Sequence, residues 1–125
     1  GLGTDVAGGY SPSMLSAVRN AVIANKALKI AGGAEASDFD FRHAFWLATV
    51  GSAEALGLED KIGSLEVGRR FDAIEVDLNF GKQQGYPCIM PGSSLAENFE
   101  KWINLGDDRQ IRRVWVDGQV IHQND

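Results

Sequence analysis

The sequence has few of the residues from which metal and disulfide centres are built. Its 125 residues include one cysteine, Cys88, and two histidines, His43 and His122, without a His-x-His or Cys-x-x-Cys pair. One cysteine excludes an intrachain disulfide and favours a reducing compartment, so we expect a cytoplasmic protein. A zinc site needs three or four converging ligands, and these residues alone predict no complete one. We expect Cys88 in a loop against the core, His43 in a structural or exposed position, and His122 in solvent after the last strand.

Long apolar runs and basic stripes are also lacking. No apolar run approaches the roughly 20 residues that span a bilayer, so we expect no membrane insertion. The net charge is -5, and the basic face typical of nucleic-acid binders is missing, so we expect no nucleic-acid partner. With 44% hydrophobic and 23% charged residues, the composition is that of a soluble globular protein.

Several catalytic and ligand-binding motifs are absent. The opening glycines do not continue into a dinucleotide fingerprint, because Val6 stands where the third glycine would be. The sequence has no Gly-Lys-Ser/Thr phosphate loop and no nucleophile elbow. Asp107 and Asp108 lack the spaced oxygen ligands of an EF-hand loop, and we predict a turn there.

The first segment is the one that carries a chemical signal. Residues 1–11 place Asp5 between two pairs of glycines, just before a helix start. Glycine tolerates positive φ and close approach of other groups, so we expect Asp5 at the exit of a strand. The residues alone leave open that Asp5 is a turn former or helix cap. The chain begins with Gly1 in what looks like a strand end, so we expect the C-terminal piece of a longer protein.

Helices are predicted in the first part of the chain. Ser11 as N-cap and Pro12 at the first helical position predict a helix that runs to about Ile30 and ends at Gly32–Gly33. Its free N–H groups would favour an anion near Asp5. After a linker, residues 34–38, a second helix is expected with Asp40 as N-cap and an apolar face made of Phe41, Ala44, Phe45 and Ala48. A break at Thr49–Gly51 is followed by a short helix, Ser52–Leu56, closed by Gly57.

Strands are predicted from Leu58 onward. The segment Phe71–Asp77 predicts a strand covered on both faces. The segment Asn79–Gly92 predicts a long loop. A helix capped by Ser93 or Ser94 and ended by Gly106 should follow, with an apolar face made of Leu95, Phe99, Trp102 and Ile103. The dipeptide Asp117–Gly118 predicts a two-residue type I′ hairpin turn within Ile111–Ile121.

Three segments resemble the guanine deaminases of the zinc amidohydrolase superfamily, in the family's order. They are Gly3–Ser11 with the wording GTDVAGGYS; Phe45–Gly51 with Ala55–Leu58, Ile62–Gly68 and Phe71–Ala73; and Leu105–Arg109 running through Ile111 into the hairpin. The middle segment is general to amidohydrolases, whereas the first and third are similar to guanine deaminases more narrowly.

This resemblance implies an α/β fold, the C-terminal fragment of a (β/α)₈ barrel followed by part of a small β-sandwich. Residues 1–57 would be the end of the last barrel strand and its helices, and residues 58–125 the C-terminal share of the sandwich. That placement agrees with the rule that catalytic groups lie at the C-terminal ends of barrel strands.

The resemblance also implies the chemistry. The family hydrolyses guanine to xanthine and ammonia with one zinc ion per subunit, commonly as a homodimer. Asp5 stands at the place of the family's metal-ligating and proton-shuttling aspartate. The family's histidine ligands, catalytic glutamate and purine-reading residues precede the place of Gly1. We therefore expect the isolated chain to be inactive and to hold zinc weakly, and its substrate-binding residues are unknown.

Two other hypotheses stay open at this point. The first is another amidohydrolase, a deaminase or chlorohydrolase that acts on a different ring. The second is a non-enzymatic assembly or binding module, in which Asp5 is only a cap and the helical apolar stripes contact a partner.

Overall fold

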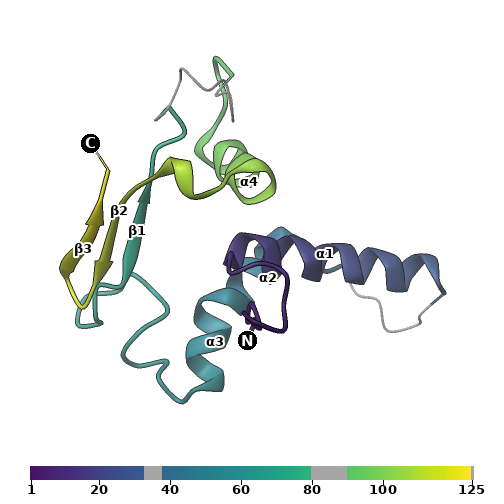
Figure 1. The fold of residues 1–125 in the computed structure, drawn as a ribbon, viewed down its shortest axis with the longest axis horizontal. Helices are drawn as coiled ribbons and strands as arrows, with labels where there is room; N and C mark the ends of the chain where they lie inside the picture. The colour runs from purple at the N-terminus through teal and green to yellow at the C-terminus, as the bar shows by residue number, and fades with distance from the viewer. Residues whose placement is uncertain (33–37, 80–89, 125) are drawn as a thin grey trace. The chain divides into compact units, whose positions relative to one another are not determined.

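The computed structural model describes residues 1–32, 38–79 and 90–124. The elements in chain order are α1 (Met14–Ile30), α2 (Phe41–Ala48), α3 (Val50–Ala55), β1 (Ala73–Val76), α4 (Leu95–Leu105), the 3-10 helix η2 (Asp108–Gln110), β2 (Ile111–Val116) and β3 (Gln119–Gln123) (Figure 1). The α/β class is as predicted. Most of the predicted linker and loop, with Cys88, lies outside the described residues.

The chain divides into two compact units, Gly1–Glu59 and Asp60–Asp125. The first unit holds α1, α2 and α3, and the second holds the strands with α4 and η2. The boundary between the two units therefore lies close to Leu58, from which the sequence predicts strands. The assignment of residues 1–57 to a barrel and residues 58–125 to a sandwich stays a prediction.

Helix α1 begins later than predicted. Its N-cap is Ser13, with no side-chain cap, and Pro12 lies before the helix. Ser11 is not the N-cap, because the helix begins two residues later than predicted; its hydroxyl accepts a hydrogen bond from the backbone N–H of Ser13 and donates one to Ser16 Oγ, both at 3.2 Å. The predicted C-terminal end is confirmed: α1 ends at Ile30, and Gly32 takes a positive φ of 77°.

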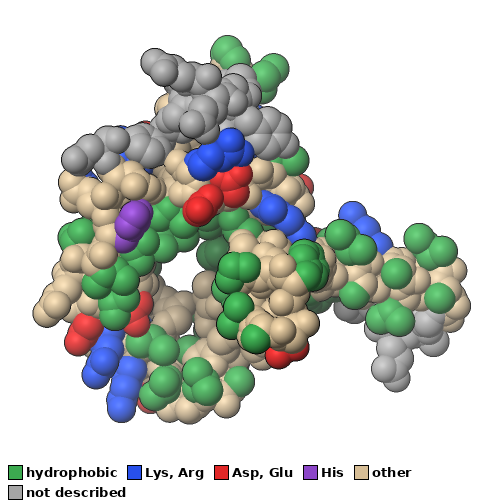
Figure 2. Space-filling view, in the orientation of Figure 1, with side chains coloured by type: hydrophobic (Ala, Val, Ile, Leu, Met, Phe, Trp, Pro, Cys, Tyr) green, Lys and Arg blue, Asp and Glu red, His purple; other side chains and the backbone are tan. Residues whose placement is uncertain are grey.

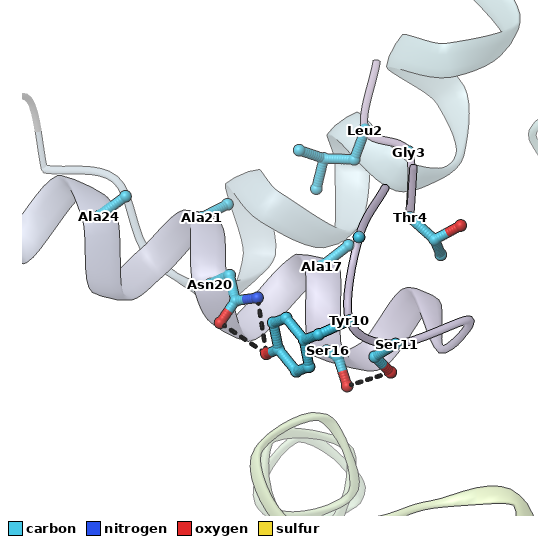
Figure 3. A pocket seen from close by; sticks show the side chains of 11 residues that line it. Leu2, Gly3, Thr4, Tyr10, Ser11, Ser16, Ala17, Asn20, Ala21 and Ala24 are labelled. Carbon is cyan, nitrogen blue, oxygen red and sulfur yellow. Dashed lines mark hydrogen bonds between the residues drawn. The ribbon is translucent and has the colours of Figure 1, made fainter. Parts of the chain in front are cut away.

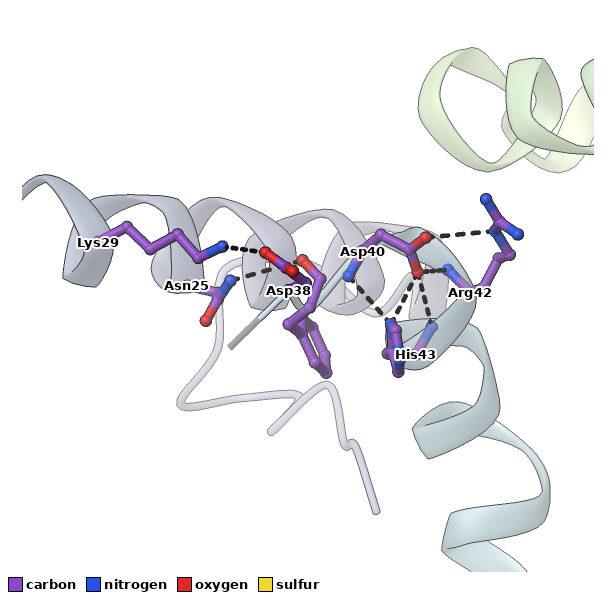
Figure 4. Close-up of polar contacts among 7 residues, drawn as sticks. Asn25, Lys29, Asp38, Asp40, Arg42 and His43 are labelled. Atoms are coloured by element: carbon purple, nitrogen blue, oxygen red, sulfur yellow. Dashed lines mark hydrogen bonds and ion pairs between the residues drawn. The ribbon is translucent and has the colours of Figure 1, made fainter. Parts of the chain in front are cut away.

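Helix α2 has the predicted N-cap. The Asp40 carboxylate accepts hydrogen bonds from the backbone N–H groups of Arg42 and His43, and His43 Nδ1 receives the Asp40 N–H at 3.2 Å (Figure 4). Ala44 is buried, whereas Trp46 is exposed, which agrees with the predicted apolar face. The His43 side chain is 61% exposed.

Helix α3 starts at Val50, two residues before the predicted start at Ser52. Thr49 serves as C-cap of α2 and N-cap of α3, so the two helices follow each other without a loop. Gly57 ends the segment with a φ of 66°. The fully buried apolar residues described in the first unit are small: Val18, Ala44 and Ala53.

The second unit contains an antiparallel sheet in the order β1-β2-β3. Asp117 and Gly118 both have positive φ, 50° and 77°, which confirms the type I′ turn between β2 and β3. His122 is exposed as predicted, but it lies inside β3, opposite Val114, and not after the last strand. Strand β1 is not covered on both faces, because Ile74 is 46% exposed.

Helix α4 carries the largest buried side chains of the second unit. Ser94 Oγ accepts the Glu97 N–H, and the Glu97 carboxylate accepts the Ser94 N–H at 2.7 Å, which makes a capping box. Trp102 and Ile103 are buried as predicted, but Leu95, in the first turn of the same helical face, is 86% exposed. Figure 2 shows further hydrophobic side chains at the surface.

The candidate active-site segment around Asp5

Asp5 lies in a tight turn that follows residues 1–4, and these residues form no strand in the structure, so the predicted position at the exit of a strand is not observed. The Leu2 N–H donates to the carbonyl of Leu47 at 3.1 Å, which attaches this segment to the end of α2. Three residues later the chain reverses, and the Asp5 carbonyl accepts hydrogen bonds from the backbone N–H groups of both Gly8 and Gly9. The backbone carbonyl of Asp5 is therefore the acceptor that closes the turn.

The Asp5 side chain is available for a ligand. The residue is exposed, and its carboxylate has no hydrogen-bond or ion-pair partner in the described parts of the chain. Its backbone has a positive φ of 49°, which aspartate tolerates better than most residues. A helix N-cap would have extended φ and ψ and a bonded carboxylate, so the structure does not support the cap hypothesis for Asp5.

The glycines of the turn have a steric role. A Cβ on Gly9 would overlap the Thr4 carbonyl oxygen, and a Cβ on Gly8 would lie 2.7 Å from Asp5 Oδ2. Neither glycine is among the described residues with positive φ. Of the two properties of glycine that the sequence suggests here, positive φ and close approach of other groups, the structure uses the second at Gly8 and Gly9.

A shallow pocket of about 330 Å³ lies beside this turn (Figure 3). One wall is α1, through Ala17, Ala21 and Ala24, and the other is the backbone around Gly3 and Thr4. A polar pair closes one side: Asn20 Nδ2 donates to the Tyr10 hydroxyl at 2.9 Å. Asp5 does not line this pocket, so the pocket is not a site for chemistry at its carboxylate.

The two histidines belong to different units of the chain. His43 is part of the capping box of α2 in the first unit, and His122 belongs to β3 in the second. In residues 1–32, 38–79 and 90–124 the structure brings together no group of three or more His, Cys, Asp or Glu side chains that could hold a metal ion. Asp5 fits one ligand position of a zinc site, and the donors described here do not fill the others.

The clearest pKa effects arise at structural ion pairs and caps. Arg109 contacts Asp107 at 2.6 Å, and this hydrogen bond and charge raise the pKa of the Arg109 guanidinium. Some desolvation raises the pKa of Asp40, but the hydrogen bonds from His43 and Arg42 lower it on balance. Lys29, 2.8 Å from Asp38, lowers the pKa of that carboxyl (Figure 4). These groups stabilise turns and helix ends.

The comparisons with known proteins identify the family. The sequence profile of the amidohydrolase family matches residues 1–121. The chain belongs to the amidohydrolase family. It is 42% identical over 131 residues to the guanine deaminase of Homo sapiens, an alignment that covers 97% of this chain and 27% of that protein. The chain thus spans about a quarter of the length of its curated relatives.

The solved structures that this chain resembles are deaminases. E. coli guanine deaminase matches with a TM-score of 0.75 and 31% identity, over 98% of this chain and 27% of that one. A guanine deaminase from C. acetobutylicum with guanine bound in its active site has a TM-score of 0.74 and 28% identity, over 96% and 26%. An adenosine deaminase from Xanthomonas campestris with bound zinc has a TM-score of 0.62 and 31% identity, over 88% and 22%.

Proposed function

We propose that this chain is part of a zinc-dependent guanine deaminase that hydrolyses guanine to xanthine and ammonia. The observation that carries the proposal is the similarity to guanine deaminases over 97% of the chain, including the turn that presents Asp5. The C. acetobutylicum structure, which holds guanine in its active site, supports the same substrate class.

The proposal includes the architecture of the whole protein. Residues 1–57 would form the end of the last strand of a (β/α)₈ barrel with the helices that follow, and residues 58–125 the C-terminal share of a β-sandwich. The complete protein would be a cytoplasmic homodimer. Within the described residues, no helix is long and apolar enough to span a bilayer.

Asp5 would perform two tasks in this reaction. A zinc ion bound at the site would lower the pKa of water and so supply a nucleophile at neutral pH. Asp5 would give one carboxylate oxygen as a ligand. It would also accept a proton from the attacking water and deliver it to the departing amino group. Its exposed carboxylate, without a partner among the described residues, is suited to both tasks.

The test is an Asp5→Ala substitution in the complete gene product. We expect guanine turnover to fall by at least about 100-fold, since a positioned acid–base group contributes that much or more. Ammonia release measures the activity, and bound zinc is measured by elemental analysis. Asp38→Ala is the matched control, because it removes an exposed carboxylate whose ion pair in the described part of the chain is with Lys29, and it should leave turnover unchanged. Full activity in Asp5→Ala would make Asp5 structural.

The isolated 125-residue chain gives a complementary test. One carboxylate binds zinc weakly, and the described residues supply no group of three donors. We expect the chain to lose zinc on dialysis and to release no ammonia from guanine. Retained zinc or measurable turnover would show that this part of the protein holds a complete site.

The similarity to an adenosine deaminase favours one alternative, an amidohydrolase that deaminates a different purine. The two hypotheses differ in the substrate and leave the role of Asp5 unchanged. Purified complete protein incubated with guanine and with adenosine distinguishes them by the ammonia released from each.

A further inference from the structure

The Asp5 carboxylate lies directly over Gly8. A Cβ built on Gly8 would lie 2.7 Å from Asp5 Oδ2, 3.3 Å from Cγ and 3.4 Å from Oδ1. A contact of 2.7 Å is shorter than real Cβ atoms make. Because Gly8 is not among the described residues with positive φ, the backbone conformation does not require glycine here. Glycine is required because the Asp5 carboxylate occupies the space in which a Cβ would lie.

The backbone around this contact is held in place. The Asp5 carbonyl accepts hydrogen bonds from Gly8 N–H, at 3.0 Å, and from Gly9 N–H. These two bonds join Asp5 and Gly8 through main-chain atoms, so a methyl group on Gly8 could not be accommodated by moving the two residues apart. The side chain of Asp5 is the part that can move, by rotation to another staggered rotamer.

We propose that Gly8 is a positioning residue for the Asp5 carboxylate: its missing side chain leaves free the place that this carboxylate occupies, from which it would bind metal and transfer a proton. The inference rests on the function proposed above. Gly8 itself would touch neither substrate nor metal, and it would act only through Asp5.

Neighbouring glycines provide matched comparisons. At Gly9 a Cβ would meet backbone atoms, overlapping the Thr4 carbonyl oxygen and lying 3.0 Å from the Asp5 carbonyl oxygen, so alanine must distort the turn. At Gly3 a Cβ would meet nothing within 4 Å. Alanine at Gly8 meets the end of a flexible side chain, which can move without distorting the turn. Stability and activity should therefore respond differently at the three positions.

The experiment compares Gly8→Ala, Gly3→Ala, Gly9→Ala and Asp5→Ala in the complete gene product. For Gly8→Ala we expect kcat for guanine to fall about 100-fold, the loss typical of a misplacement near 1 Å, with KM nearly unchanged. Its melting temperature should match that of the wild-type protein, and a crystal structure should show Asp5 in a different rotamer. Gly3→Ala should behave as wild type in every measurement.

The outcomes separate the two proposals. If Asp5→Ala is inactive while Gly8→Ala has wild-type kcat, or keeps the Asp5 rotamer, the positioning role is wrong and the proposed function stands. A melting temperature of Gly8→Ala lowered as far as that of Gly9→Ala would also overturn it, because Gly8 would then be a structural residue of the turn. Full turnover by Asp5→Ala would overturn the proposed function together with this inference.

Discussion

At the scale of single residues, the turn at Asp5 has positive φ at some positions and requires a missing side chain at others. Left-handed backbone falls on Asp5 and Ala7, with φ of 49° and 90°. The glycines that follow, Gly8 and Gly9, instead provide space for a carboxylate and for two carbonyl oxygens. A β-carbon at positive φ costs free energy, so Ala7 is a strained position beside the proposed catalytic residue.

Ala7→Gly should stabilise the protein. Glycine adopts a φ of 90° without the steric cost of alanine, so we expect the free energy of unfolding to rise by about 1 kcal/mol. Ala27→Gly is the control with the opposite sign: Ala27 lies exposed within α1, where glycine costs about 0.5–1 kcal/mol. Denaturant unfolding followed by circular dichroism measures both. A destabilised Ala7→Gly variant would show that the turn does not hold Ala7 at positive φ.

At the scale of elements, caps decide where the helices begin. The sequence leaves Ser93 and Ser94 as equal candidates for α4, and the structure selects Ser94 through its reciprocal bonds with Glu97. At α1 the local signal is displaced by two residues: the N-cap is Ser13, and the Ser11 hydroxyl bonds to Ser13 and Ser16. The N-cap is the residue whose own backbone is extended while the next residue is helical, and that residue is Ser13.

Ser94→Ala should destabilise α4. It removes the side-chain acceptor of the Glu97 N–H, and such caps contribute about 1 kcal/mol. Ser93→Ala is the matched control, one residue earlier, and should change the free energy of unfolding by only a few tenths of a kcal/mol. Equal losses in the two variants, measured by thermal unfolding, would contradict the assignment of the cap.

The same capping box predicts a pH dependence. Hydrogen bonds from the backbone and side chain of Ser94 lower the pKa of Glu97 below its ordinary value of 4.5. A group with a lowered folded-state pKa stabilises the protein above its unfolded pKa and loses this contribution as the pH falls through the folded value.

Glu97→Gln should therefore reduce the loss of stability on acidification. The comparison is between thermal unfolding at pH 7 and at a pH well below 4.5, at which the folded protein is also protonated at Glu97, for wild type and variant. The two proteins should differ more in stability at pH 7 than in acid. A difference that is independent of pH would show that the Glu97 carboxylate is not held by Ser94.

At the scale of the whole molecule, few apolar side chains are fully buried among the residues that the structure describes. The buried apolar residues described are Val18, Ala44, Ala53, Trp102 and Ile103. Large apolar side chains in both units remain in solvent, among them Ile30 at 88% and Leu95 at 86% exposed. Figure 2 shows hydrophobic side chains at the surface. Exposed apolar surface of this kind favours association.

The isolated 125-residue chain should self-associate. We expect its average sedimentation coefficient to rise with protein concentration, because association removes apolar side chains from water. Ile30→Lys together with Leu95→Lys should weaken the association, while Lys26→Gln, in the same helix as Ile30, serves as the control. A single monomeric species at all concentrations would contradict this expectation.

Much of the local structure follows directly from the order of the residues. Asp40 as a cap, Gly57 and Gly106 as helix ends, and Asp117–Gly118 as a hairpin turn all depend on bonds within a few residues of one another. Such bonds are encoded in short stretches, so patterns predict them. The resemblance of the segment around Asp5 to guanine deaminases also depends on a short run of residues, Gly3–Ser11, and can be recognised without the structure.

Other features depend on how distant or facing parts of the chain come together. The exposure of Leu95 and Ile74, against their apolar patterns, depends on which surfaces other elements cover, and no local pattern records that. The contact between Gly8 and the Asp5 carboxylate depends on a turn that brings residues three apart face to face. A glycine that supplies space and one that supplies a backbone conformation look alike in the sequence, because only the three-dimensional neighbours of the missing side chain distinguish them.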